Sequence, residues 1–122
     1  MRVRKLLSVS ILLSLATSRI SAAQDRVVPD SAAARFVGQT VTVEGTVASV
    51  GSSRRSATTF LNLGAAYPNQ TFTAVIFRSA ASRFPNPQQW EGKRVRVTGK
   101  VRLYREKPEI VLEEPSQIVL AP

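Results

Sequence analysis

The sequence of 122 residues contains no cysteine and no histidine. Without cysteine the chain can form neither a disulfide framework nor a thiolate nucleophile, and a Cys-based zinc site is excluded as well. Without histidine it lacks the imidazole of Ser–His and Cys–His nucleophilic centres. Acidic residues are scarce too, 8 against 17 lysines and arginines. These absences favour a small basic binding domain, and they leave a carboxylate-based enzyme as the weaker alternative.

Sustained hydrophobic sequence is also scarce, and the one apolar run lies near the N-terminus. Basic residues in Met1–Lys5 precede the apolar stretch Leu6–Ala16, and Ser21–Ala23 form a small-residue cleavage site before Gln24. A stretch of 11 residues is too short for a bilayer, which requires about 20. We therefore predict a secretory signal peptide over residues 1–23 in a bacterial setting. The alternative is an N-terminal amphipathic helix of the folded domain.

The predicted leader has consequences for location and organisation. Export would place the protein in the periplasm or outside the cell, and no cysteine is available for a lipid anchor, so we expect no stable membrane anchor. Four of the basic residues lie in the leader, and the remaining chain is still basic. Its length indicates one domain. We expect residues 24–29 to be a flexible segment and residues 30–122 to fold.

Two kinds of local pattern are visible after the leader. Residues 30–38 predict a short helix that ends at Gly38, and residues 78–84 predict one or two helical turns before Pro85. Elsewhere apolar residues alternate with polar ones at the period of a β-strand. The predicted strands are the first from Thr40 to about Val47, then 58–63, 71–77 and 94–104, and a fifth made of 109–112 and 117–120.

This order of elements predicts an all-β fold with minor α content. Five strands in about 100 residues, with a short helix before the first and a helical insert between the third and fourth, are typical of a five-stranded OB barrel. An SH3-like barrel or an immunoglobulin sandwich would not carry a helix at that insert. Gly45 and Gly99 lie within strands and suggest the bends that a barrel requires.

The fourth predicted strand has one apolar and one basic face. Val95, Val97, Gly99, Val101 and Leu103 are expected to face the interior. The opposite face would present four cations and an aromatic ring: Arg94, Arg96, Lys100, Arg102 and Tyr104. Same-face residues repeat every 6 to 7 Å or so along a strand, which is close to the phosphate repeat of an extended nucleic acid. The alternative is a solvated face whose charges discourage edge pairing.

Loops and a neighbouring strand supply further candidates for a ligand-binding surface. Arg54 and Arg55 lie in the predicted loop after the first strand, and residues 104–107 connect the fourth and fifth, the two loops that flank the groove of OB domains. Phe60 could stack a base, or it could pack in the core as Phe72 could. The predicted nucleic-acid-binding residues are Arg54, Arg55, Phe60, Asn62, Arg96, Lys100, Arg102, Tyr104, Arg105 and Lys107.

Several segments together resemble one family. They are residues 38–47, 59–64, 67–76, 92–101 and 104–110. On these residues the chain resembles small secreted bacterial OB-fold proteins labelled DNA-binding, whose module also occurs beside extracellular nuclease domains. The resemblance implies a fold of the nucleic-acid-binding type with no catalytic residues. Relatives often have glycine where this chain has Glu106.

Three functions remain open on this basis. The first hypothesis is an exported, non-catalytic OB-fold module that binds single-stranded DNA or RNA, or another polyanion. The second is a periplasmic envelope-stress or interaction module that binds a protein, a peptide or an anionic glycan, and the third is an accessory domain of a nuclease. A metal-dependent nuclease needs clustered carboxylates, but Asp25 and Asp30 precede the first strand and Glu113 and Glu114 face opposite sides of a strand. We therefore predict no catalysis, no metal and no cofactor.

Overall fold

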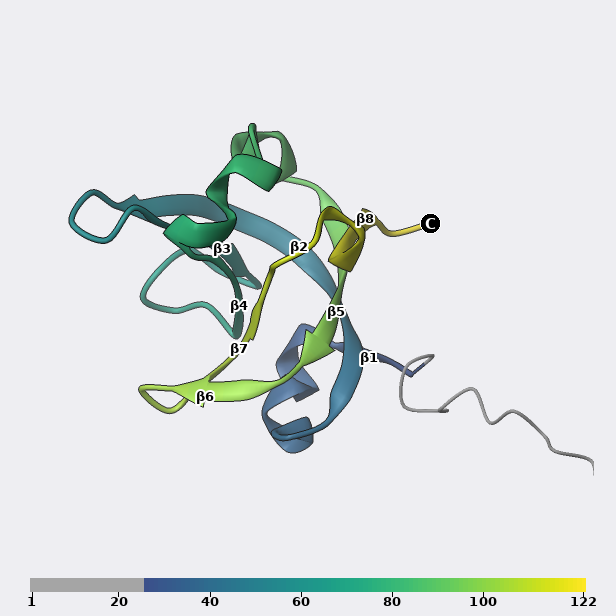
Figure 1. Ribbon diagram of the computed structural model, residues 1–122. Helices are drawn as coiled ribbons and strands as arrows, with labels where there is room; N and C mark the ends of the chain where they lie inside the picture. Colours follow the sequence, from purple (N-terminus) through teal and green to yellow (C-terminus); the bar gives the residue numbers. More distant parts are fainter. Residues whose placement is uncertain (1–25) are drawn as a thin grey trace, which may run out of the picture.

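The computed structural model describes residues 26–122, and the predicted signal peptide lies outside the described residues (Figure 1). Within this range, strands are joined by turns and by short 3-10 helices. None of these helices has the length and hydrophobicity that a membrane span requires. The strands are β1 Val27–Pro29, β2 Thr40–Ser53, β3 Thr58–Leu63, β4 Phe72–Ile76, β5 Arg94–Lys100, β6 Arg102–Tyr104, β7 Lys107–Val111 and β8 Ile118–Leu120. The helices are η1 Asp30–Phe36, η2 Arg78–Arg83, η3 Pro87–Trp90 and η4 Pro115–Gln117.

The strands form one continuous sheet in the order β6-β7-β4-β3-β2-β5-β8, and β1 pairs in parallel with β2. Strand β2 is shared between two halves of this sheet. Its first half, Thr40–Thr46, pairs with β5, and its second half, Val47–Ser53, pairs with β3. The register shifts between Val47 and Ser49, and such an irregularity lets a long strand bend. The single strand therefore turns the corner between the two halves.

The two ends of the sheet are adjacent along the chain. Strands β5 and β6 are separated only by Val101, whose main chain hydrogen-bonds to Gly38 and Gln39. Gly99 of β5 also lies so close to β7 that an added Cβ would be 2.5 Å from Cγ2 of Ile110. The sheet therefore curls on itself, as the ribbon shows (Figure 1). An OB-like all-β fold is confirmed, whereas the exact five-stranded barrel stays a prediction.

The core lies between the two halves of the curled sheet. Alternating residues of β2, β3 and β5 enter it, including Val41, Val43, Leu61 and Val97, all fully buried. Burial of each such aliphatic side chain contributes about 1.5–3 kcal/mol of transfer free energy. The register of the third predicted strand, left open by its sequence, has Phe72, Ala74 and Ile76 in this core cluster. Trp90 packs against the same cluster from η3.

Several boundaries differ from the sequence-based expectation. Val27–Pro29 form strand β1, and Val28 is buried, so this part of the segment predicted as flexible is paired with β2. The predicted loop residues 51–53 extend β2. The fifth predicted strand is in two pieces, as the sequence predicts, with η4 between them, but its second piece, β8, pairs with β5 and not with β4. Pro115 explains the division, because proline provides no N–H for a continuing ladder.

The fourth predicted strand, residues 94–104, differs most from the sequence-based expectation. Alternation holds through β5, where Val95 and Val97 are buried, but the strand breaks at buried Val101. Beyond the break β6 pairs with β7 instead of β2. Leu103, expected in the interior, is 51% exposed. Residues on either side of Val101 therefore belong to different parts of the sheet and do not form one continuous face.

Candidate binding cleft

A cleft of about 680 Å³ opens on the face of β3, β4 and β7. Its borders lie on the left of Figure 1 and are the end of β2 at residues 51–53, the β3–β4 loop and the β6–β7 hairpin. Its lining residues come from all of these elements: Gly51, Ser52, Ser53, Phe60, Asn62, Tyr67, Pro68, Gln70, Thr73, Tyr104, Arg105, Lys107, Pro108 and Glu109. A volume of this size is typical of a ligand-binding cleft.

The wall formed by β3 and β4 carries one aromatic ring and one amide. Phe60 is half-buried and lies opposite Val75 across the strand pair, whereas Phe72 is fully buried in the core. Asn62 is only 4% exposed. Its Nδ2 donates to Oγ of Ser49 at 3.2 Å, and its Oδ1 accepts from Oγ1 of Thr73 at 3.4 Å. The amide of Asn62 is thus held by protein groups, while the ring of Phe60 remains partly accessible in the cleft.

The β6–β7 hairpin forms one rim. Its two turn residues, Arg105 and Glu106, have φ values of +50° and +68°, the backbone region of a type I′ turn, which favours glycine or asparagine. Tyr104, just before the turn, is 53% exposed. The guanidinium carbon of Arg105 lies 5.3 Å from the centroid of the Tyr104 ring. The hairpin therefore presents an aromatic ring with a cation stacked on it.

Lys107 connects this hairpin with the β3–β4 loop, which forms another rim of the cleft. Its Nζ donates to the main-chain oxygen of Pro68 at 2.7 Å and to that of Gln70 at 3.0 Å. Both acceptors belong to the β3–β4 loop, which also carries Tyr67 with 74% of its surface exposed. Lys107 was predicted to contribute charge to a ligand, but the structure shows its ammonium group bound to two carbonyls. Sequence reasoning did not select Tyr67, although an aromatic residue in a turn-forming loop, between Gly64 and Pro68, was a signal for it.

Three of the four cations of the fourth predicted strand are paired with glutamates, and two of these share one carboxylate. Nε of Arg94 lies 2.8 Å from Oε2 of Glu44, and Nε of Arg96 lies 2.7 Å from Oε1 of the same carboxylate. The hydrogen bond from Arg96, and secondarily that from Arg94, holds the pKa of Glu44 below its usual value. These ion pairs form because the register of β2 and β5 places Glu44 directly opposite Arg96.

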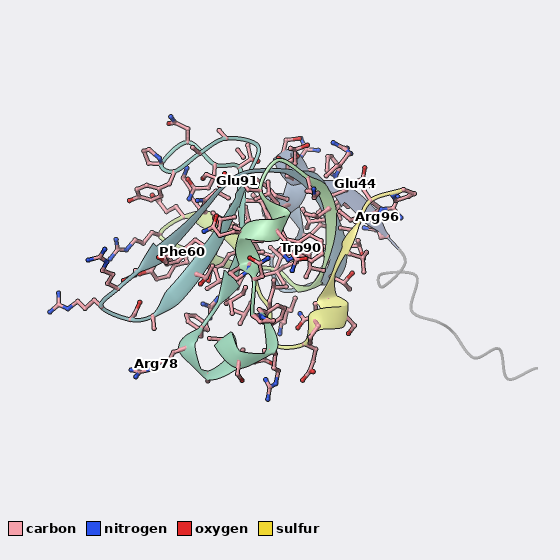
Figure 2. All side chains as sticks on the ribbon, turned by 90° about the horizontal axis from the view of Figure 1, so that it is seen from above. Glu44, Phe60, Arg78, Trp90, Glu91 and Arg96 are labelled. Carbon is pink, nitrogen blue, oxygen red and sulfur yellow. The ribbon has the colours of Figure 1, made fainter. Side chains whose placement is uncertain are left out.

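The remaining two cations of that strand are also separate from the cleft lining. Arg102 pairs with buried Glu109 at 2.6 Å, and its guanidinium lies 5.5 Å from the ring centroid of Phe77. Exposed Lys100 lines, with Arg102, a different hollow of about 300 Å³. In Figure 2, Phe60 lies on one side of the molecule, and Arg96 lies with Glu44 on the other. The predicted basic face is therefore divided and partly neutralised.

The predicted site residues fall into three groups. The structure brings five of them together in the cleft: Phe60, Asn62, Tyr104, Arg105 and Lys107. Arg54 and Arg55 are exposed in the turn that directly follows cleft residue Ser53. The three others are outside the cleft lining: Arg96, Lys100 and Arg102.

Comparisons with known proteins establish the fold class only. No protein-family model matches the chain, and no curated protein matches it. Among solved structures it is similar to a chain named as an aspartyl-tRNA synthetase from Leishmania major Friedlin, with a TM-score of 0.51 and 12% identity over 82% of this chain. It is also similar to OBody AM1L10 bound to hen egg-white lysozyme, with a TM-score of 0.50 and 20% identity over 71% of this chain and 83% of the other.

A third similar structure is an aspartyl-tRNA synthetase from Entamoeba histolytica, with a TM-score of 0.47 and 18% identity over 72% of this chain and 20% of the other. The chain spans about a fifth of the Leishmania synthetase, 21% of its length. At these identities the likeness shows an OB-like fold and nothing about a particular ligand.

Proposed function

We propose that the protein is an exported, non-catalytic module, built as a five-stranded OB barrel, that binds single-stranded DNA or RNA in the cleft. The observation that carries the proposal is the presence of Phe60, Tyr104 and Arg105 in one cleft on the open face of the sheet. Aromatic rings stack bases, at about 1–3 kcal/mol per base, and cations attract the phosphates between them.

The charge distribution favours the cleft, and not the face of the fourth predicted strand, as the surface that contacts the nucleic acid. Arg94 and Arg96 share one carboxylate, and Arg102 is bound to Glu109, so each already has an anionic partner. A phosphate would have to displace that partner. Arg105 stacks on an exposed ring at the cleft, and Arg54 and Arg55 lie exposed at its border. We propose that these three arginines supply the electrostatic attraction.

The comparisons and the remaining residues are compatible with this class of function. A chain named as an aspartyl-tRNA synthetase shares the fold, which supports nucleic-acid binding in general terms. Within residues 26–122, no group of three or more carboxylate side chains lies close enough to hold a metal ion. Export is proposed from the predicted leader alone.

The experiment is a salt titration of oligonucleotide binding. Fluorescence anisotropy of a labelled oligo(dT) of about 12 nucleotides, within the site sizes of OB domains, would be measured with the purified protein. We expect saturable binding whose affinity falls as salt rises from about 50 to 200 mM. Phe60→Leu should weaken binding while the salt dependence stays the same. No binding at the lowest salt, or binding equally tight at both concentrations, would refute the proposed function.

A second candidate is a module that binds a protein or peptide, as the envelope interaction hypothesis predicts. One structural neighbour is an OBody bound to lysozyme, so a related fold does hold a protein partner. This chain also exposes aliphatic side chains outside the cleft, with Leu103 at 51% and Leu120 at 56%. Capture of the same envelope protein by the native chain, but not by Leu103→Ser, would favour this candidate over nucleic acid.

A further inference from the structure

Tyr67 is the most exposed aromatic side chain of residues 26–122, with 74% of its surface accessible. It lines the cleft from the β3–β4 loop, and Tyr104, 53% exposed, lines the same cleft from the β6–β7 hairpin. Exposed apolar side chains that gather in one place mark interaction sites and ligand-binding grooves. Two such rings that line one cleft from two different connections indicate a ligand with a flat apolar group.

The two rims are joined by one side chain. Lys107 follows the hairpin turn, and its Nζ donates to the carbonyl oxygens of Pro68 and Gln70 at 2.7 and 3.0 Å. Pro68 is the residue after Tyr67. Because a charge-assisted hydrogen bond is stronger than a neutral one, this link restrains the β3–β4 loop relative to the hairpin. The separation between Tyr67 and Tyr104 therefore depends on Lys107.

Two further observations concern groups in this part of the cleft that still have room for a contact from a ligand. Arg105 lies over the Tyr104 ring, and Tyr104 is still 53% exposed with this cation in place. In addition, Oε1 of Gln70 is buried and has no hydrogen-bond partner among the described residues. A buried acceptor without a donor costs free energy, and such groups in native proteins are often completed by a ligand or by water.

We propose that Tyr67 and Tyr104 form a two-sided clamp that holds one base of a single strand, and that Lys107 is the positioning residue that sets its width. This deepens the proposed function and rests on it. The base stacks between the two rings, and the strand leaves the cleft past Arg105. Lys107 acts on the loop through its carbonyls and makes no phosphate contact. A duplex is excluded because its bases are already stacked and paired.

The clamp is tested by pairing a protein change with a ligand change. Affinities of the native protein and of Tyr67→Ala would be measured for oligo(dT) and for an oligomer of the same length without bases. Loss of one stacking contact is worth about 1–3 kcal/mol, so we expect affinity for oligo(dT) to fall between about 5-fold and 150-fold. Binding of the abasic oligomer should not change. Tyr67→Phe, which keeps the ring, is the matched control and should bind as the native protein does.

The role of Lys107 has its own readout in the salt dependence. Lys107→Met should weaken oligo(dT) binding and leave the slope of log affinity against log salt unchanged. If Lys107 contacted a phosphate, the slope would fall by about 0.7. In the Lys107→Met background, Tyr67→Ala should have a smaller effect than in the native chain, because the ring is no longer held opposite Tyr104. Thermal unfolding of each variant would verify that the fold is retained.

The possible failures are distinguishable. If Tyr67→Ala binds oligo(dT) normally while Phe60→Leu does not, the clamp is wrong and the proposed function stands. If the abasic oligomer is affected as strongly as oligo(dT), Tyr67 contacts the backbone and the clamp is again wrong. If the native protein binds no oligonucleotide, the proposed function and the clamp both fail.

Discussion

Nε of Arg96 on β5 donates a hydrogen bond to Oε1 of Glu44 on β2 at 2.7 Å, on the other side of the molecule from Phe60 (Figure 2). The same carboxylate accepts a second hydrogen bond from Arg94. Two arginines of the predicted basic face are therefore bound to a carboxylate in the folded chain. The distinction between cations with and without partners determines which substitutions should affect binding.

Substitution of Arg96 should not affect oligonucleotide binding, whereas substitution of Arg105 should. We expect Arg96→Gln to bind oligo(dT) within about 2-fold of the native protein, since an ion-paired cation releases few counterions. Arg105→Gln should weaken binding and lower the salt slope by about 0.7. The measurement is anisotropy at several salt concentrations. Arg78→Gln, an exposed cation away from the cleft lining, controls for net charge, and equal losses in all three variants would contradict the assignment.

The Glu44 cluster should make stability depend on pH in the acid range. The pKa of Glu44 is lowered in the folded state, mainly by the hydrogen bond from Arg96. A lowered pKa contributes stability that is fully present above the unfolded-state pKa and is lost as pH falls through the folded-state pKa. We expect Glu44→Gln to unfold at a lower temperature than the native chain near neutral pH. The difference should shrink below the ordinary pKa of glutamate, and a constant difference between about pH 7 and pH 3 would contradict this linkage.

Glu106→Gly should stabilise the protein. Glu106 has φ of +68° at the second position of the hairpin turn, where a side chain costs about 1–2 kcal/mol in strain. Part of the relief is offset because glycine increases the entropy of the unfolded chain, so we expect a gain of about 0.5–1 kcal/mol in the free energy of unfolding. Urea denaturation measures it. Glu106→Ala keeps the strain and should give no gain, and equal stabilisation by both changes would point to the lost charge instead.

Gly99→Ala should destabilise the fold by about 1–3 kcal/mol, the usual cost of overpacking. An added Cβ would lie 2.5 Å from Cγ2 of Ile110, which is fully buried. At Gly99, β5 lies close to β7, where the sheet curls on itself, and an added methyl group would push the two strands apart. Gly51→Ala is the matched control, because a Cβ there would have no atom within 4 Å. Urea denaturation of both variants tests the close approach, and equal stability of the two would contradict it.

Part of the site was within reach of sequence reasoning. Phe60 and Tyr104 were selected because strand alternation and loop position bring aromatic residues to the groove of an OB fold, and both line the cleft. Tyr67 was not selected, because its place in the same cleft as Tyr104 depends on a contact between segments about 40 residues apart. The link through Lys107 likewise joins a side chain to main-chain carbonyls, which no side-chain pattern reveals.

The sequence by itself determined which residues fill the core only where the alternation is regular, in the first half of β2 and in β5. A period of two is a local property of an extended chain, and it placed Val41, Val43, Val95 and Val97 inside without knowledge of any partner strand. Only the tertiary structure decided what the outward-facing charges meet, because strand register and the break at Val101 are set by the closing of the whole sheet. The register places Glu44 opposite Arg96, and the break sends Arg102 toward Glu109.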